Sequence, residues 1–294
     1  MAQKRTYQPK VKIGNWTEDQ QLEEDAKKEY QEKKERGELT SQKEDLLKRN
    51  MFTPVNLSVT TDGNVHIGDV VMLVNAGGGN RECSAVSINT DIDRLIKFPS
   101  TTIQTPCEVC AGRIIQPCTR TAFIITSVDD SPEGSTLYYE QTFALKTTSG
   151  FARGLYLTSD LRSFQKYAKK SRLQEVNLVE DTSYLSWWKI EYFNPQERLE
   201  FEGQPVPANV NVVIKHCKTN RALAVLSDHI IWTACGREYE LTAHTFLDSH
   251  KAEQDTNHWM LCTSAPVGGR LLIPNHSKLA DDDNNTELTQ ENLD

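Results

Sequence analysis

The chain has 294 residues, a formal net charge of −8 and a sequence pI near 5.5. This acidic balance argues against general nucleic-acid binding, and no apolar run is long enough for a membrane-spanning helix, so neither nucleic acid nor a membrane is an expected partner. The first residues lack the apolar segment of a secretory signal, and the 7 cysteines are an odd number, so we expect reduced thiols in an intracellular compartment.

Residues 1–56 are predicted to form an N-terminal arm with little core of its own. Thr17 begins a capping-box pattern, and Glu and Lys recur four residues apart, which predicts a helix from Thr17 to Gly37. A second capping pattern predicts a short helix from Ser41 to Asn50.

The first predicted helix has a narrow apolar stripe, formed by Leu22, Ala26 and Tyr30. Such a stripe is too thin to pack well against a domain of the same chain. The helix is therefore either a solvated, charged helix or one that keeps its shape against a partner, and the sequence leaves both readings open.

Residues 57–274 are rich in predicted strands and contain a repeated pattern of four short β-like runs that closes on tryptophan. Such self-similarity indicates copies of one supersecondary unit. We expect three units of four strands, at about residues 65–130, 137–200 and 205–265, that close into a β-trefoil barrel. The first unit is the most diverged, and its middle, about Asp91 to Thr119, is predicted to be irregular. The two clearer copies are Phe143–Leu145, Leu155–Leu157, Leu173–Leu178 and Trp187–Ile190, and Val212–Ile214, Ala222–Val225, Tyr239–Ala243 and Trp259–Leu261.

The closing tryptophans Trp188 and Trp259 are predicted to fill the barrel core, because each recurs at the same place in its unit. The competing role is that of an exposed platform for a ligand. Residues 275–294 are dominated by Asp, Glu and Asn, which predicts a disordered acidic tail.

Cys107, Cys110 and Cys118 are the sharpest metal-like signal. A CxxC pair can hold a zinc ion, but a structural site needs four ligands, and only His66 or Cys83 is at hand for the fourth. Ordinary buried or loop thiols are the favoured interpretation, so no metal site is predicted.

The remaining chemistry-bearing residues predict no enzyme and no cofactor. His244, His250 and His258 match neither a zinc motif nor a catalytic triad with a recognisable nucleophile. The glycines Gly77–Gly79 lack the Lys-Ser/Thr of a phosphate-binding loop.

A compact basic patch is predicted on a loop inside the second unit. On an acidic protein this patch either docks an acidic partner surface or is simply solvated. Its members are Arg162, Lys166, Lys169, Lys170 and Arg172.

The second and third units resemble the MIR motif, a β-trefoil building block. In the second unit the matching residues are Leu157–Ser159, Leu173–Val176 and Trp188–Ile190. MIR domains occur in mannosyltransferases and calcium-release channels of the endoplasmic reticulum. The chain shows neither a signal sequence nor membrane spans, so those functions are not expected here.

A longer resemblance runs from about residue 11 to 262. The strings that carry it include Ile13–Asp19, Leu57–Thr60, Val71–Asn75, Pro205–Asn209, Ala243–His250 and Asn257–Leu261. In order along the chain, they are similar to the cilia- and flagella-associated protein 161 family, whose members are microtubule inner proteins. The segment from Gly77 to Cys118 departs from that pattern.

The resemblance implies a structural protein on the luminal wall of axonemal doublet microtubules in motile cilia and flagella, a part of the cytoskeleton in the cytoplasm. The partners implied are α- and β-tubulin and other microtubule inner proteins. The expected contact residues are the basic patch together with Ile13, Asn15, Trp16, Leu22 and Tyr30. The alternative is a cytosolic trefoil that binds a glycan or small ligand through Trp187, Trp232 and Tyr239.

Overall fold

The computed structural model describes residues 16–77, 82–89 and 103–264. The chain divides into two compact units, residues 1–49 and 50–294. We call them the helical unit and the β unit. Ile13, Asn15 and the predicted acidic tail at 275–294 lie outside the described residues.

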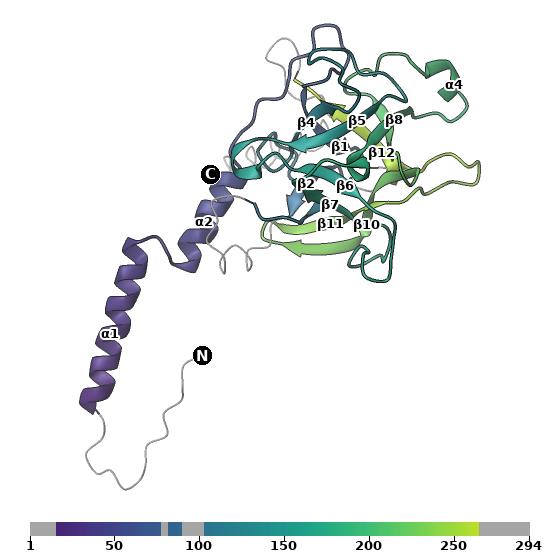
Figure 1. Cartoon of the computed structure of the whole chain (residues 1–294). Coiled ribbons are helices and arrows are strands. Elements are labelled where there is room, and N and C mark those ends of the chain that lie inside the picture. The colour runs from purple at the N-terminus through teal and green to yellow at the C-terminus, as the bar shows by residue number, and fades with distance from the viewer. Residues whose placement is uncertain (1–15, 78–81, 90–102, 265–294) are drawn as a thin grey trace, which may run out of the picture. The chain divides into compact units, whose positions relative to one another are not determined.

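The helical unit contains α1 (Trp16–Glu35) and most of α2 (Thr40–Met51) (Figure 1). Both helices were predicted, with bounds that differ by one or two residues. Gly37 has a φ of +70°, which glycine adopts without a Cβ clash. The amide of Glu38 donates to the carbonyl of Lys33 at 2.8 Å, and that of Gly37 donates to Lys34 at 3.2 Å. This Schellman arrangement ends α1 where the sequence placed its C-terminal glycine.

The surface of α1 is rich in charged residues, some of which form i,i+4 ion pairs. Glu23 pairs with Lys27 at 3.2 Å and Glu29 with Lys33 at 2.6 Å. The apolar Leu22 and Tyr30 are 47% and 56% exposed. The helix is therefore stabilised by its own backbone and by surface pairs rather than by burial of its apolar stripe.

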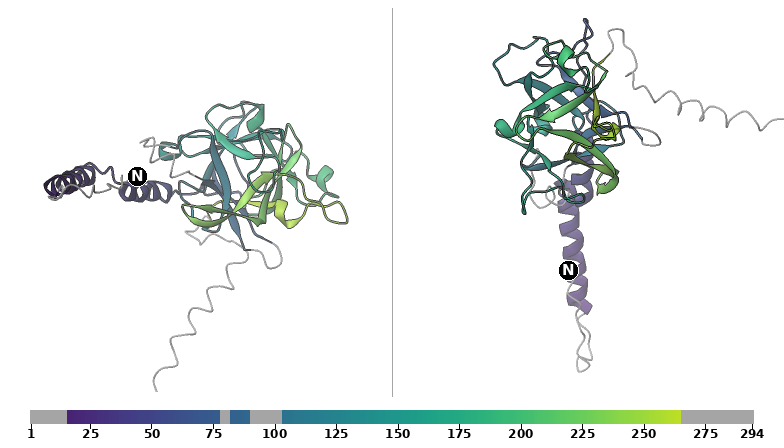
Figure 2. Two further views of the ribbon diagram at one scale, coloured as in Figure 1. Left: turned by 90° about the horizontal axis from the view of Figure 1, so that it is seen from below. Right: turned by 90° about the vertical axis from the view of Figure 1, so that its right-hand side faces the viewer.

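The β unit is a closed antiparallel barrel with added hairpins (Figures 1 and 2). Strand β1 pairs with β4, β4 with β5, β5 with β8, β8 with β9, β9 with β12, and β12 returns to β1. The pairs β2–β3, β6–β7 and β10–β11 are hairpins, and β3 joins β7 and β11. The prediction of a mainly β domain is confirmed, and closure leaves the ring no unpaired edge.

The strands take the following bounds: β1 Val70–Asn75, β2 Ser84–Asn89, β3 Cys107–Gly112, β4 Ala122–Ser127, β5 Thr142–Thr147, β6 Tyr156–Ser159, β7 Val176–Val179, β8 Trp188–Tyr192, β9 Asn211–His216, β10 Arg221–Thr233, β11 Gly236–Ala243 and β12 His258–Cys262. Short helical turns lie between them: η1 Gly150–Ala152, η2 Tyr184–Ser186, α4 Arg198–Phe201 and η3 Asp255–Asn257.

Strand β3 falls inside the segment that the sequence predicted to be irregular, so that prediction was wrong there. The run Cys107–Gly112 alternates weakly in polarity because nearly all of it is buried, which hides the strand pattern.

The barrel interior is a single large apolar cluster, and Trp188 and Trp259 are fully buried in it. The indole Nε1 of Trp188 donates to the carbonyl of Leu157 at 2.8 Å, and that of Trp259 donates to Leu223 at 2.9 Å. Each ring therefore fills space and also satisfies its one polar atom. The prediction that these tryptophans form core is confirmed.

Candidate functional site

The predicted basic patch lies on the loop 160–172 between β6 and β7, which we call the basic loop. Its base is fastened to β11, because the amides of Lys170 and Ser171 each donate to the carboxylate of Glu240 at 2.7 Å. Glu240 is only 3% exposed, and Ala168 within the loop is buried as well. The loop is thus an ordered projection from the barrel rather than a free linker.

The cations of the basic loop differ in their surroundings. Lys166 pairs with Asp160 at 3.2 Å, and Lys169 pairs with Glu108. The Arg172 guanidinium lies 4.5 Å from the ring centre of Tyr167, within cation–π range. Within the described residues, Arg162 and Lys170 are exposed and make no ion pair.

Two apolar side chains of the basic loop point to solvent and were missed at the sequence level. Phe164 is 97% exposed and Leu161 is 58% exposed. The turn that carries Phe164 is closed by a bond from the Ser163 amide to the Lys166 carbonyl at 3.0 Å. The sequence signal for them was the presence of two apolar residues in a basic segment between strands. The loop was predicted as a contact site from its charge alone.

The predicted arm contacts lie on or before α1. Trp16 is the first residue of that helix, and Leu22 and Tyr30 present exposed side chains along it. These residues belong to the helical unit, whereas the basic loop belongs to the β unit.

The three cysteines of the zinc hypothesis are not brought together. Cys107 and Cys110 lie three residues apart on β3 and have different partners, since Cys107 Sγ donates to the Asn89 carbonyl and Cys110 Sγ to Glu238. Cys118 Sγ lies 3.4 Å from Thr121 Oγ1. Among the described residues, no group of three or more His, Cys, Asp or Glu side chains is placed to hold a metal ion.

Cys110 belongs instead to a buried polar cluster that no local sequence pattern reveals. Arg120 and Glu238 are 1% and 2% exposed, and Arg120 Nη2 donates to Glu238 Oε2 at 2.5 Å. Burial raises the pKa of Cys110 well above its ordinary value, so the thiol stays protonated and donates to Glu238. Burial alone would raise the pKa of Glu238, but hydrogen bonding to and attraction by Arg120 lower it, so the carboxylate is charged.

The three C-terminal histidines are dispersed. The ring of His244 packs against Phe246, His258 Nδ1 lies 3.5 Å from Asp255 Oδ1, and His250 is on the exposed 248–251 turn. Burial lowers the pKa of both His244 and His258, which favours their neutral forms. None of these arrangements supplies an activated nucleophile.

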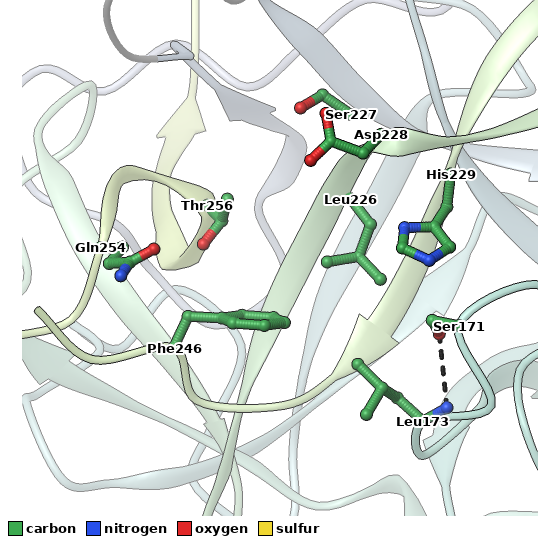
Figure 3. Close-up of a pocket in the computed structure, with 9 residues that line it drawn as sticks. All are labelled: Ser171, Leu173, Leu226, Ser227, Asp228, His229, Phe246, Gln254 and Thr256. Carbon is green, nitrogen blue, oxygen red and sulfur yellow. Dashed lines mark hydrogen bonds between the residues drawn. The ribbon is translucent and has the colours of Figure 1, made fainter.

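A cavity of about 280 Å³ lies beside a bulge in β10 (Figure 3). The register of β10 against β11 shifts between Leu226 and Ile230, and the intervening residues line the cavity. Within the described residues, His229 Nδ1 and Thr256 Oγ1 are buried without a hydrogen-bond partner. The cavity lining consists of Ser171, Leu173, Leu226, Ser227, Asp228, His229, Phe246, Gln254 and Thr256.

This cavity combines apolar walls with hydrogen-bonding groups, and none of the described residues that line it is a Lys or Arg. Such a lining suits a small neutral group better than an anion. The aromatic residues predicted for a glycan site lie elsewhere. Trp187 and Trp232 are 38% and 78% exposed and do not line it, and Tyr239 is 7% exposed in the barrel core. The prediction of Tyr239 as an exposed ligand platform was therefore wrong, because its ring packs inward.

Solved structures with a similar fold have low sequence identity to this chain. One is a Caenorhabditis elegans protein described as having unknown function, with a TM-score of 0.50, 13% identity, and coverage of 69% of this chain and 97% of that one. Another is an SDF2-like protein from Arabidopsis thaliana, with a TM-score of 0.49, 13% identity, and coverage of 67% and 93%. Across the described residues, no helix is both long and apolar enough to cross a membrane.

Sequence comparison is more specific. The model of the cilia- and flagella-associated protein 161-like domain matches residues 43–264. Cilia- and flagella-associated protein 161 of Danio rerio is 54% identical over 274 residues, which cover 91% of each chain. The Bos taurus protein of the same name is 42% identical over 272 residues, covering 90% of this chain and 84% of the relative. With a match across most of its length, this chain belongs to the cilia- and flagella-associated protein 161 family.

Proposed function

We propose that this chain is a non-enzymatic structural protein of motile cilia and flagella. In this proposal it is a microtubule inner protein that binds the luminal wall of axonemal doublet microtubules and stabilises their lattice during beating. The names of the relatives support a role in the cilium.

The observation that carries the proposal is that apolar side chains of α1 are exposed in the helical unit. Helix α1 holds 20 residues but leaves Leu22 and Tyr30 about half exposed. An isolated helix of this length is marginal in water, because most helix stability in proteins comes from packing. A surface outside the chain that covers this stripe would supply the missing packing.

The partners in this proposal are α- and β-tubulin and neighbouring inner proteins. The contact residues are the α1 residues Trp16, Leu22 and Tyr30, the preceding Ile13 and Asn15, and the cations of the basic loop. Two separate contact regions on one chain raise the residence time on a periodic lattice, because release requires both to detach together.

The β unit is proposed to be a β-trefoil of three pseudo-repeats. The pairing scheme recurs, since each of β1, β5 and β9 pairs with a hairpin strand and with two other ring strands. The matched indole bonds of Trp188 and Trp259 add a side-chain repeat. An experimental structure should allow the three units to be superposed by successive rotations of about 120°, as expected for a closed threefold barrel.

Extraction of axonemes tests the functional proposal. Tagged protein expressed in ciliated cells should stay with the doublets after detergent and rising salt, until the doublets themselves dissolve. Cryo-electron microscopy of those doublets should then place it in the lumen. Release in mild salt, or density on the outer wall, would contradict the proposal.

The cavity beside the β10 bulge favours a second candidate, a module that binds a small neutral ligand. The observation in its favour is that His229 Nδ1 and Thr256 Oγ1 have no hydrogen-bond partner in the part of the chain that the structure describes. A glycan array and nuclear magnetic resonance titration with neutral monosaccharides would test it. Absence of shifts at these residues would remove this candidate without affecting the structural one.

A further inference from the structure

The basic loop presents an exposed aromatic side chain on an ordered turn. Phe164 is 97% exposed, although the turn beneath it is fixed by the Ser163–Lys166 backbone bond. The Ser163 hydroxyl also accepts from the amides of Gln165 at 3.3 Å and Lys166 at 3.0 Å. Because the backbone of the turn is already fixed, burial of the ring by a partner costs mainly the rotamer freedom of the Phe164 side chain.

The foot of the loop borders a second exposed ring. Lys218 Nζ lies 3.3 Å from Asp160 Oδ1, at the start of the basic loop, and 4.6 Å from the ring centre of Tyr184. Tyr184 is 54% exposed. Lys218 thus connects the basic loop to η2, and the apolar residues are flanked by cations from two elements.

Beyond Asp160, the charged side chains of the basic loop are all positive. From Leu161 to Arg172 every charged residue is Lys or Arg, in a chain whose net charge is −8. Arg162 and Lys170 are exposed without an ion pair among the described residues, so their charges remain available to a partner. A cationic rim around an aromatic anchor is complementary to an acidic rim around an apolar socket.

We infer that the basic loop is a docking knob, with Phe164 inserting into an apolar socket on an acidic protein surface. The inference deepens the proposed function, on which it rests for placing that surface among the proteins of the doublet. A protein surface is favoured over an anionic bilayer, because the acidic remainder of the chain is repelled by anionic lipid.

Site-specific photo-crosslinking tests the contact directly. The photoreactive amino acid p-benzoylphenylalanine is placed at residue 164 or, as a matched control, at Leu199, in full-length protein expressed in ciliated cells. Leu199 is 87% exposed on α4, but it is flanked by Glu197, Glu200 and Glu202. Position 164 should crosslink to a protein segment rich in Asp and Glu, at least fivefold above position 199. Equal yields at the two positions, or crosslinks from 164 to lipid alone, would overturn the inference.

Retention in salt-washed axonemes supplies a second measurement. We expect Phe164→Ala to lower the retained fraction on the order of tenfold, as for an interface anchor, with Leu199→Ala unchanged. The double variant Arg162→Glu/Lys170→Glu should be released at lower salt than the matched charge reversal Arg237→Glu/Lys251→Glu. Thermal unfolding of all variants should match the wild type, since these side chains are exposed.

The outcomes separate the two proposals. Wild-type protein that washes out in mild salt, together with a strong 164 crosslink to an acidic protein outside the doublet, would reject the microtubule role and keep the docking knob. Retained wild-type protein with equal crosslinking at 164 and 199 would keep the microtubule role and reject the knob.

Discussion

The two units of the chain use charged residues in opposite ways. In the helical unit Glu29 and Lys33 pair at the surface, with side chains 66% and 50% exposed. In the β unit Arg120 and Glu238 pair at 1% and 2% exposure. Surface pairs contribute little to stability, whereas removing one partner of a buried pair leaves a charge without compensation. The β unit is therefore expected to be stable through its own interior, and the helical unit to depend on a surface it binds.

The largest effect is predicted for the barrel core, where two neighbouring tryptophans provide a matched pair. Trp188 is fully buried, and Trp187 is 38% exposed. Replacing Trp188 with Ala should reduce the free energy of unfolding by about 3–5 kcal/mol, because it creates a cavity and leaves the Leu157 carbonyl without its indole donor. Replacing Trp187 with Ala should cost no more than about 1 kcal/mol.

Urea unfolding of the full chain, followed by circular dichroism of the β signal, measures both changes. Trp259→Ala serves as a second core variant and should resemble Trp188→Ala, since it has the same burial and the same type of bond. Similar costs at 187 and 188 would mean that the barrel interior is not the main source of stability.

A somewhat smaller effect is predicted for the buried ion pair. Arg120→Met keeps an apolar stem but leaves the Glu238 carboxylate buried without its cation, so we expect a loss of about 3 kcal/mol in unfolding free energy. The double variant Arg120→Met/Glu238→Gln should recover part of this loss, because no charge is then left buried. The same urea titration decides, and a double variant less stable than the single one would contradict this explanation.

The core tryptophans could be predicted from the sequence, whereas the buried ion pair could not. Trp188 and Trp259 were predictable as core, because each closes a repeated strand pattern. Arg120 lies just before β4, and Glu238 lies on β11, 118 positions further along the chain. No local sequence pattern reveals a contact between residues so far apart. The cysteine spacing suggested metal chemistry, but on a strand a separation of three residues turns two side chains to opposite faces.

The candidate surfaces were predictable in composition but not in geometry. The basic loop was found from its Lys and Arg content, whereas the full exposure of Phe164 depends on a turn fixed by backbone bonds. The cavity depends on the bulge in β10, where Ser227, Asp228 and His229 interrupt an otherwise apolar strand. That polar interruption was the available signal, but the residues from other segments that complete the cavity could not be placed.

A moderate dependence of β-unit stability on pH is predicted from His216. Its Nε2 lies 3.0 Å from the Leu185 carbonyl and must donate to it, and in the neutral ring Nδ1 accepts from the Thr219 hydroxyl at 2.9 Å. Burial lowers the pKa of His216 from 6.5. Because the unfolded chain then binds the proton first, stability is full above about pH 6.5 and falls as the pH drops below it, towards the lowered folded pKa.

Thermal unfolding between pH 7.5 and 5.5 measures this dependence. His216→Gln should be less stable at pH 7.5 but lose less stability on acidification than the wild type does. Glu238 and Glu253 have lowered pKa values, so their contributions are lost only below their ordinary value of 4.5, outside this range. If the two proteins respond equally to pH, other groups cause the dependence. His244 and His258, whose pKa values are also lowered, would then be tested.

The smallest effect is predicted for the surface pairs of the helical unit. Glu29→Gln removes the carboxylate charge from the 2.6 Å pair with Lys33 but leaves both side chains in water, so the urea midpoint of the β unit should not move. The helical circular dichroism signal should fall slightly, because the i,i+4 pair supports the isolated helix. Glu23→Gln, which removes the charge from the 3.2 Å pair with Lys27 earlier in the same helix, should behave in the same way. A shift in the midpoint as large as that from Arg120→Met would mean that the helical unit contributes directly to the stability of the β unit, and the contrast between the two kinds of ion pair would then fail.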